Sequence, residues 1–375
     1  MSNHHTQKLN ILQIRQYYRN HKHIIANAVV KALQKEGHDV SVLFIYEAPS
    51  PEIESDLKCR TICLQNGKSG KRPGKRTIVK FMRELFRREP FDAIITHRYR
   101  PCALAAKAAT GSSAGKKIAV FHNLYIFKRF RRKLFARFYL KNWTLVGVSS
   151  AVTEDLINSK SGFTKNRVVT IPNAIRIADA ENAFLPREKA REKLGIPEHA
   201  FTFGNIGRLS PTKGQDNLID AFARIAQNAP DSYLVIAGDG SYKNKLLEAI
   251  NRSSLKSRIL LTGYLENGHQ YLKALDAFVF PSKKEAFGKA LLEAMVARLP
   301  VIAANAPGGI QELLGSYKHM YDINDIDRLS ELMLAMYGMS NGERENIGRQ
   351  LYDRAVARFD IEHLETAYQR LVRLP

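Results

Sequence analysis

The chain has 375 residues, of which 45% are hydrophobic and 25% charged, and this composition is typical of a soluble globular protein with two cores. The first ten residues lack the apolar segment of a secretory leader, and no run approaches the ~18 apolar residues of a membrane span, so we expect neither export nor membrane insertion. Cys59, Cys63 and Cys102 show no metal-ligand spacing and predict no disulfide framework, which indicates a reducing compartment.

The net charge of +22 is concentrated in the first half of the chain. Residues 1–175 contain 32 Lys and Arg against 11 Asp and Glu, an excess of +21, whereas residues 176–375 contain 26 against 25, an excess of +1. A charge that served only solubility would not need to segregate in this way. The asymmetry therefore indicates a negatively charged partner for the first half.

In chain order, the first half alternates short apolar runs with helical or basic segments. A helix is predicted over residues 24–36, and strands are predicted over residues 9–14, 39–46, 91–97, 116–122 and 144–149. Strands that alternate with helices are typical of a parallel sheet.

Two segments contain much of the positive charge. Residues 68–88 begin as a Gly/Pro-containing loop and continue as a basic helix. Residues 126–143 contain seven basic residues and no acidic one, and Phe127, Phe130, Leu134 and Phe138 recur at helical spacing. This pattern predicts a basic amphipathic helix suited to an anionic membrane surface. The alternative is a helix that packs its aromatic stripe into its own domain while the basic residues are solvated.

A charged connector at residues 181–200 separates this half from a second series of strand and helix patterns. Strands are predicted over residues 201–207, 232–238, 258–263, 277–282 and 300–305. The economical architecture is two doubly wound α/β domains in tandem, joined near residues 174–200. We expect an amino-terminal domain over residues 1–173 and a carboxyl-terminal domain over 174–350.

The second half places a phosphate-binding pattern directly after its first strand. Gly207 and Arg208, followed by Lys213, lie between that strand and the next helix. Glycine lets backbone amides approach an anion, the helix N-terminus favours negative charge, and the two basic side chains supply positive charge. Further glycine turns at residues 238–240 and at Gly263 follow later strands, so we expect all three turns at the same edge of the sheet.

Two glutamates, Glu285 and Glu293, flank a strand-to-helix junction at that edge. Ligands of open α/β sheets bind outside the carboxyl ends of the strands, so these carboxylates are candidates to accept hydrogen bonds from the hydroxyls of two rings. Glu293 is expected about two helical turns beyond Glu285. The alternative for a carboxylate at a helix start is a favourable interaction with the helix dipole.

The ordered set from Gly204 to Glu312 resembles the retaining glycosyltransferases of family four, and a weaker resemblance covers nearly all of the remaining chain. The resemblance implies the GT-B fold, with two doubly wound Rossmann-like domains facing each other across a cleft. It also implies that Arg208 and Lys213 bind the donor diphosphate, that Glu285 lies at the donor sugar and that Glu293 holds the ribose. These motifs are specific as a combination.

The same resemblance assigns further residues. The turn formed by residues 286–289 (Ala286, Phe287, Gly288 and Lys289) would supply backbone amides to the sugar and phosphate, together with the phosphate turns at Gly207 and Gly240. His122 occupies the position of a histidine that approaches the transferred sugar. The catalytic set would then comprise Glu285, His122, Arg208 and Lys213. A C-terminal helix over residues 351–375 would cross back to the first domain.

Two features depart from the family pattern or compete with it. Residues 15–21 stand where the family usually has a Gly-Gly turn, so we expect Arg19 and His21, with His122, to contact an anionic acceptor. Asp325 and Asp327 fit a short metal-binding pattern, but two acids are a poor Mg²⁺ cage and aspartates are typical of helix starts. We therefore expect no metal and no cofactor.

The resulting hypothesis is transfer of a hexose from a nucleotide diphosphate sugar, UDP-hexose by family frequency, with retention of configuration. The basic first domain would receive an anionic lipid-linked glycan, with the lipopolysaccharide core as the specific candidate. The enzyme would be cytoplasmic and peripheral at the inner membrane face. Two alternatives stay open: a nucleic-acid-binding protein that uses the basic half, and a GT-B sugar-nucleotide epimerase.

Overall fold

A computed structural model describes residues 7–17, 24–46, 51–64, 72–112 and 114–373. The chain divides into two compact units, each of which is described by itself. Unit 1 comprises residues 1–174 and 361–375, and unit 2 comprises residues 175–360. Arg19 and His21, expected at the acceptor, lie outside the described residues.

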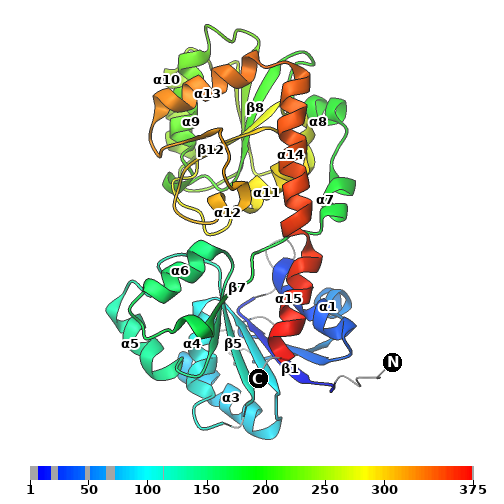
Figure 1. Cartoon of the computed structure of the whole chain (residues 1–375), viewed down its shortest axis with the longest axis vertical. Coiled ribbons are helices and arrows are strands. Elements are labelled where there is room, and N and C mark those ends of the chain that lie inside the picture. The colour runs from blue at the N-terminus through cyan, green and yellow to red at the C-terminus, as the bar shows by residue number, and fades with distance from the viewer. Residues whose placement is uncertain (1–6, 18–23, 47–50, 65–71, 113, 374–375) are drawn as a thin grey trace. The chain divides into compact units, whose positions relative to one another are not determined.

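Unit 1 contains a parallel sheet of seven strands in the order β3-β2-β1-β4-β5-β6-β7 (Figure 1). The strand order reverses direction between β1 and β4, where Ile11 pairs with Val40 on one side and with Ala93 on the other. The strands are β1 (Asn10–Arg15), β2 (Asp39–Phe44), β3 (Arg60–Cys63), β4 (Ala93–His97), β5 (Lys116–Phe121), β6 (Thr144–Gly147) and β7 (Val168–Thr170).

Helices cover both faces of this sheet, which explains why its central strands are apolar runs without alternation. All five residues of β4 are buried, as are five of the six in β1. The helices are α1 (Ile24–Lys35), α2 (Pro51–Leu57), α3 (Lys75–Arg88), α4 (Tyr99–Ala108), α5 (Phe130–Tyr139), α6 (Ser150–Asn158) and α15 (Ile361–Arg373), with a 3₁₀ turn η1 (Lys165–Arg167).

Unit 2 contains a second parallel sheet, in the order β10-β9-β8-β11-β12-β13. Its strand order reverses between β8 and β11, where Phe203 pairs with Ala277. The strands are β8 (Phe201–Ile206), β9 (Ser232–Ala237), β10 (Ile259–Gly263), β11 (Ala277–Phe280), β12 (Val301–Ala304) and β13 (Met320–Tyr321).

The remaining helices surround this second sheet. They are α7 (Ile177–Ala183), α8 (Arg187–Leu194), α9 (Gln215–Ile225), α10 (Lys243–Arg252), α11 (Lys289–Val296), α12 (Ile310–Leu314), α13 (Ile326–Gly338) and α14 (Asn341–Phe359), with 3₁₀ segments η2 (Pro211–Lys213) and η3 (Gly268–Ala274). Both sheets have the strand order of doubly wound nucleotide-binding folds. The predicted fold class, two doubly wound Rossmann-like domains, is confirmed.

The helix that returns to unit 1 begins later than the sequence suggested. Residues 351–359 belong to α14, whose Leu351, Ala355 and Phe359 are buried in unit 2, and the Phe359 carbonyl accepts a hydrogen bond of 3.1 Å from the Ile175 amide. The returning helix is α15, which starts at Ile361 rather than at residue 351. The apolar contacts of α14 explain the difference, because they hold the chain on unit 2 as far as Asp360.

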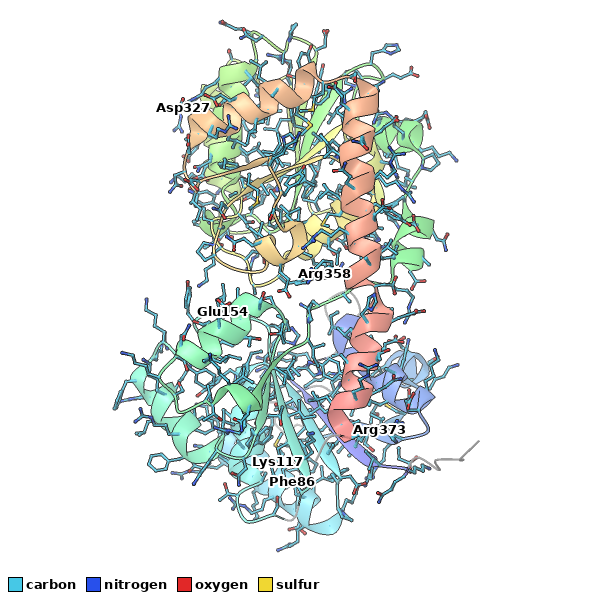
Figure 2. All side chains as sticks on the ribbon, in the orientation of Figure 1. Phe86, Lys117, Glu154, Asp327, Arg358 and Arg373 are labelled. Atoms are coloured by element: carbon cyan, nitrogen blue, oxygen red, sulfur yellow. The ribbon has the colours of Figure 1, made fainter. Side chains whose placement is uncertain are left out.

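Helix α15 packs on α1 within unit 1 (Figure 1). The Gln369 side chain donates a hydrogen bond of 3.2 Å to the Ala32 carbonyl, and Arg373, labelled in Figure 2, forms an ion pair with Glu36. The apolar face of α15, which includes Leu364 and Tyr368, is buried. Unit 1 is therefore completed by a segment from the far end of the chain.

The buried ion pair between Arg191 and Asp276 stabilises unit 2, and its loss should lower the stability more than the loss of an exposed ion pair. Asp276 accepts a hydrogen bond of 2.7 Å from Arg191, whose side chain is 3% exposed, and another of 2.8 Å from the Thr202 amide. The Asp276→Ala change leaves the guanidinium buried without its carboxylate, and we expect a loss of about 3–5 kcal/mol in the free energy of unfolding. Urea denaturation measures this loss.

The matched control is Glu331→Ala, which breaks a pair of similar length between Arg328 and Glu331, 2.8 Å apart with side chains 50% and 64% exposed. Water screens that pair, so its loss should change stability little. Equal effects of the two changes would contradict a stabilising role for the buried pair.

Candidate functional site

The candidate site of unit 2 lies where its strand order reverses. Strands β8 and β11 are neighbours there, and both end at the same edge of the sheet. The loop after β8 contains Arg208 and Lys213, and the loop after β11 contains Glu285. Such a switch point is the usual ligand site of an open α/β sheet.

The loops after β8 and β11 are joined by backbone contacts. The Lys283 amide donates a hydrogen bond of 2.9 Å to the Thr212 carbonyl. Gly214 has φ +68°, and a Cβ at this position would lie 2.1 Å from the Pro281 carbonyl oxygen. Only glycine permits this approach, so the turn that precedes α9 is fixed against the end of β11.

The side chains of Lys213 and Glu285 form an ion pair across these two loops. They are 20% and 18% exposed, and the Lys213 ammonium also lies 5.6 Å from the centre of the Phe280 ring. Limited exposure to water strengthens the attraction relative to a surface pair. The pair places one positive and one negative group just beyond the carboxyl ends of β8 and β11.

Arg208 differs from Lys213 in being exposed and in forming no ion pair with any described residue. Its backbone is nevertheless fixed, because the Arg208 carbonyl accepts a hydrogen bond of 3.3 Å from the side chain of Gln215. The same Gln215 amide lies 3.3 Å from the Asn205 side chain, which donates to the Val279 carbonyl at 2.9 Å. The Arg208 guanidinium thus extends from an ordered turn and is available to an anion.

Two glycines after β9 hold that turn in place. The Gly207 amide donates to the Ala237 carbonyl at 2.9 Å, and a Cβ on Gly238 would lie 1.9 Å from the Gly207 oxygen. A Cβ on Gly240, whose φ is +159°, would lie 2.1 Å from the Leu209 oxygen. Gly240 therefore has a packing role, whereas a Cβ on Gly207 would meet no atom within 4 Å and the space beside it is open.

The backbone of Glu285 is clamped by the turn after β12. The Glu285 amide donates to the Pro307 carbonyl at 3.2 Å, and its carbonyl accepts from the Gly309 amide at 3.1 Å. Gly308 has φ +134°, and a Cβ there would lie 1.4 Å from the Glu285 oxygen. The glycine turn at residues 308–309 is therefore required for the position of Glu285.

Glu293 lies on α11, which begins at Lys289. It is 9% exposed and forms an ion pair with Lys289, one turn earlier. Because the residues from Glu285 to Gly288 form a turn, Glu293 is little more than one helical turn into α11, not two turns beyond Glu285 in one helix. The predicted separation of about two helical turns between the two glutamates was wrong, because the turn before α11 takes up about half of the intervening residues.

The turn formed by residues 286–288 leads into α11 with Gly288 at φ +105°. The Phe287 ring is 4% exposed and contacts the Phe359 ring edge to face, with centroids 5.9 Å apart. Only the backbone of Phe287 can therefore serve a ligand. The roles suggested for Ala286, Phe287, Gly288 and Lys289 stay predictions.

The structure adds two residues that the sequence did not single out at this edge. The Lys283 ammonium lies 3.8 Å from the Asp216 carboxylate, which also accepts a hydrogen bond of 3.1 Å from the Tyr242 hydroxyl. Lys283 could have been predicted at the site because it is only two residues from Glu285. Asp216 could not, because an acidic residue in the first turn of a helix such as α9 is common without any ligand.

In unit 1, two histidines meet at the carboxyl ends of neighbouring strands. His97 is the last residue of β4, and His122 follows β5. The Nδ1 atom of His97 and the Nε2 atom of His122 are 3.3 Å apart, and His97 is 4% exposed. The sequence analysis singled out His122 but not His97, although His97 also stands at the carboxyl end of a strand.

Arg15 ends β1 at the switch point of unit 1 but is turned inward. It is 1% exposed and donates to the side chains of Gln13 and Asn27 and to the Ala26 carbonyl. Arg15 therefore stabilises the fold at this edge of the sheet, and its side chain is not accessible to a ligand in solvent.

Asp325 and Asp327 have structural partners. The Asp325 carboxylate caps α13 by accepting from the Arg328 amide at 2.9 Å. Asp327, which projects from the outer side of α13 in Figure 2, pairs with Arg224. Among the described residues, no group of three or more His, Cys, Asp or Glu side chains is arranged to hold a metal ion.

The sequence left two alternatives for residues 126–143, an exposed apolar stripe or a stripe packed into the domain, and each holds for part of the segment. Phe127 precedes α5, is 1% exposed and packs edge to face on Phe121 and Phe163. In contrast, Phe130, Leu134 and Phe138 form a strip along α5 and are 76%, 44% and 73% exposed. None of the helices in the described part of the chain combines the length and the apolar character that crossing a bilayer needs.

The chain matches two family models, one in each half. The model described as "Glycosyltransferase Family 4" matches residues 23–179, and the model described as "Glycosyl transferases group 1" matches residues 186–354. The chain belongs to the glycosyltransferase families that these models describe, and its fold is GT-B. The predicted family is thus confirmed.

The chain is 31% identical over 204 residues to an uncharacterized glycosyltransferase of Methanocaldococcus jannaschii, a match that covers 54% of the chain and 48% of that protein. It is 27% identical over 257 residues to the UDP-Gal:alpha-D-GlcNAc-diphosphoundecaprenol alpha-1,3-galactosyltransferase of Escherichia coli, covering 65% of the chain and 66% of that protein. The chain therefore spans between about half and two thirds of the length of these curated relatives.

Solved structures resemble the chain over almost its whole length. Anabaena HepE in complex with UDP and glucose has a TM-score of 0.78 at 21% identity, covering 98% of this chain and 100% of that one. The apo form of the lipopolysaccharide outer core galactosyltransferase WaaB has a TM-score of 0.72 at 17% identity, covering 98% and 100%. At these identities the likeness shows the fold.

The Gly308 clamp gives a prediction for the site. In Gly308→Ala the new methyl group overlaps the Glu285 carbonyl and the residue must leave its left-handed conformation, so we expect a loss of at least about 2 kcal/mol in stability and impaired binding of nucleotide. Thermal unfolding with and without UDP measures both effects.

Gly342→Ala is the control, because Gly342 lies in the first turn of α14 and a Cβ there meets no atom within 4 Å. This change should leave nucleotide binding unaltered and keep or slightly raise stability. Unimpaired UDP binding by a folded Gly308→Ala protein would contradict the proposed clamp.

Proposed function

We propose that the protein transfers a hexose from a UDP-hexose to an anionic lipid-linked glycan, with retention of the anomeric configuration. The observation that carries this proposal is the switch point of unit 2, where the available Arg208 and the Lys213–Glu285 pair lie together. A nucleotide diphosphate sugar matches this set, since it joins an anionic diphosphate to a ring rich in hydroxyls.

The cations would act on the leaving group. As the bond between the anomeric carbon and the phosphate oxygen breaks, negative charge grows on the diphosphate, and Arg208 and Lys213 would stabilise it without a metal ion. Arg208 is available from the start, because no described carboxylate pairs with it. Lys213 would exchange part of its interaction with Glu285 for the diphosphate.

Glu285 would orient the sugar and would not attack it. Its carboxylate is engaged by Lys213, and its backbone is held on both sides by the turn after β12. The acceptor hydroxyl would attack on the face from which the phosphate departs, and the departing phosphate would take the proton. Glu293, on α11, would hold the ribose hydroxyls.

Several observations support an anionic acceptor at a membrane surface. Unit 1 carries most of the positive charge, and the α5 strip of Phe130, Leu134 and Phe138 is exposed among basic residues. The E. coli relative is named for a diphosphoundecaprenol-linked acceptor, and the WaaB structure is named for the lipopolysaccharide outer core. We propose the lipopolysaccharide core as the acceptor and the inner face of the cytoplasmic membrane as the location.

Removal of Arg208 tests the donor site. Loss of one preorganised charge contact raises the barrier by about 2–4 kcal/mol, so Arg208→Ala should lower kcat roughly 30- to 1,000-fold. Transfer from UDP-glucose and UDP-galactose to core-truncated lipopolysaccharide is the assay. The control is Arg224→Ala, which removes an exposed arginine of α9 that pairs with Asp327 and should leave kcat unchanged.

A thermal-shift panel of UDP-, GDP- and ADP-glucose identifies the nucleotide independently of the acceptor. A ligand at 100 times its dissociation constant stabilises the folded state by about 2.7 kcal/mol. We expect this effect with the UDP sugar in the wild type and its reduction in Arg208→Ala. If no nucleotide sugar stabilises the wild type, the proposed donor site is wrong.

The α5 strip makes a separate prediction about membranes. Phe130→Ser/Phe138→Ser should release the protein from vesicles that contain anionic phospholipid, because both rings lose their burial among the acyl chains. The control Leu247→Ser/Val356→Ser removes two other exposed apolar side chains, 38% and 40% exposed, in unit 2. Vesicle flotation at low and high salt measures binding. If binding of the wild type does not depend on the anionic lipid content of the vesicles, the membrane proposal is wrong.

A further inference from the structure

Unit 1 contains a cavity of about 760 Å³ that the donor chemistry does not use. Helices α3, α4 and α5 form its walls, and α4 packs against both of the others (Figure 1). Seven basic side chains line it, four from α3, two from α4 and one from α5, and no acidic residue is among the lining residues. We call this cavity the cationic pocket.

The cations of this pocket are not neutralised within the described chain. None of the seven forms an ion pair with a described residue. On the same helix α3, in contrast, Arg87 and Arg88 both pair with Glu84, outside the pocket. Like charges gathered in one concave surface repel each other, so an arrangement of this kind is stabilised by an anionic ligand.

Aromatic rings hold part of this charge in place. The Arg132 guanidinium lies 4.4 Å from the centre of the Tyr99 ring, and the Lys107 ammonium lies 6.0 Å from that of Phe135. The Arg83 guanidinium donates to the Lys107 carbonyl at 3.4 Å. These contacts orient the cations but leave their charge uncompensated, which favours a multiply charged group such as clustered phosphates.

The place of the pocket in the fold indicates where such a group comes from. Only residues 89–92 connect α3 to the start of β4, and α4 follows β4 after Arg98, so both helices begin at the carboxyl edge of the sheet. That edge carries His97 and His122. Lys75 and Arg100, in the first turns of these helices, therefore place one end of the pocket at the edge at which the acceptor is proposed to bind, and Lys107, in the last turn of α4, lies towards the opposite edge.

The pocket also adjoins the exposed apolar strip. Phe135 lines the pocket from α5, and the 100° rotation per residue of a helix places it about 60° from Phe138, whereas Arg132 lies about 120° or more from every residue of the strip. The pocket therefore borders the strip on its Phe138 side. A ligand with clustered phosphate and apolar chains would satisfy both surfaces together. A soluble anion would use only the pocket.

We propose that the cationic pocket binds the phosphate head group of a membrane amphiphile, and thereby holds unit 1 on the bilayer in a fixed orientation. This inference rests on the proposed membrane function, but it requires neither donor binding nor transfer. The expected ligands are lipids with a phosphomonoester or more than one phosphate, because a single phosphodiester supplies too little charge for seven cations.

The test compares two double variants that lose the same charge from the same unit. Lys80→Gln/Lys107→Gln removes two exposed lysines of the pocket, and Lys141→Gln/Lys165→Gln removes two exposed lysines of unit 1 that do not line it. Calorimetric titration with inorganic pyrophosphate, with UDP present in saturating amount to occupy the proposed donor site, should show about tenfold weaker binding for the pocket variant, and less than about twofold change for the control.

Flotation with phosphatidylcholine vesicles that contain phosphatidic acid, or an equal charge of phosphatidylglycerol, identifies the source of the phosphate. The wild type and the control variant should prefer phosphatidic acid, and the pocket variant should lose this preference. Equal losses in the two variants, or no pyrophosphate binding by the wild type, would overturn the pocket. If the pocket variant loses pyrophosphate binding but binds vesicles like the wild type, the ligand of the cationic pocket is a soluble phosphate, and the proposal of a lipid head group is wrong.

Stabilisation by UDP-sugar provides the separate readout of the proposed donor function. It should be the same in the wild type and in both double variants, because unit 2 is unaltered. A failure of the donor proposal would appear as absent UDP stabilisation in all three proteins, whereas a failure of the pocket would appear only in the phosphate titrations.

Discussion

The ion pair between Lys213 and Glu285 joins the two loops that leave the sheet of unit 2 where its strand order reverses. Both side chains are largely shielded from water, so their positions determine each other. The backbone around them is equally constrained, because Gly214 and Gly308 allow contacts that a Cβ would prevent. The geometry available to a diphosphate and a sugar therefore depends on this pair and on the glycines that support it.

The two units use positive charge differently. In unit 2 almost every cation near the site has a carboxylate partner, as Lys213, Lys283 and Lys289 do, and Arg208 stands out as available. In unit 1 the cations of the pocket lack such partners among the described residues. Paired cations are suited to precise positioning of one ligand, and unpaired cations to attraction of an anionic surface.

The sequence by itself determined the fold class and the meeting of the loops that contain the candidate residues of unit 2. Apolar runs that alternate with helical patterns require parallel strands, and parallel strands end at one edge, so the loops with Arg208, Lys213 and Glu285 had to meet there. The aspartates at residues 325 and 327 were also interpreted correctly as helix-start residues, since local capping chemistry is encoded within a few positions. Local pattern and sheet topology were enough for these conclusions.

Only the tertiary structure decided which of the remaining residues act together. His97 and His122 come from different strands, and Arg15 is buried by contacts with α1, so no spacing in the sequence distinguishes an inward arginine from an exposed one. The same helical period describes a packed stripe and an exposed one, and the structure divides the segment between Phe127, which is buried, and the strip on α5. The cationic pocket likewise exists only because three helices pack side by side. Each of these features depends on contacts between segments distant in the chain, which a linear pattern does not contain.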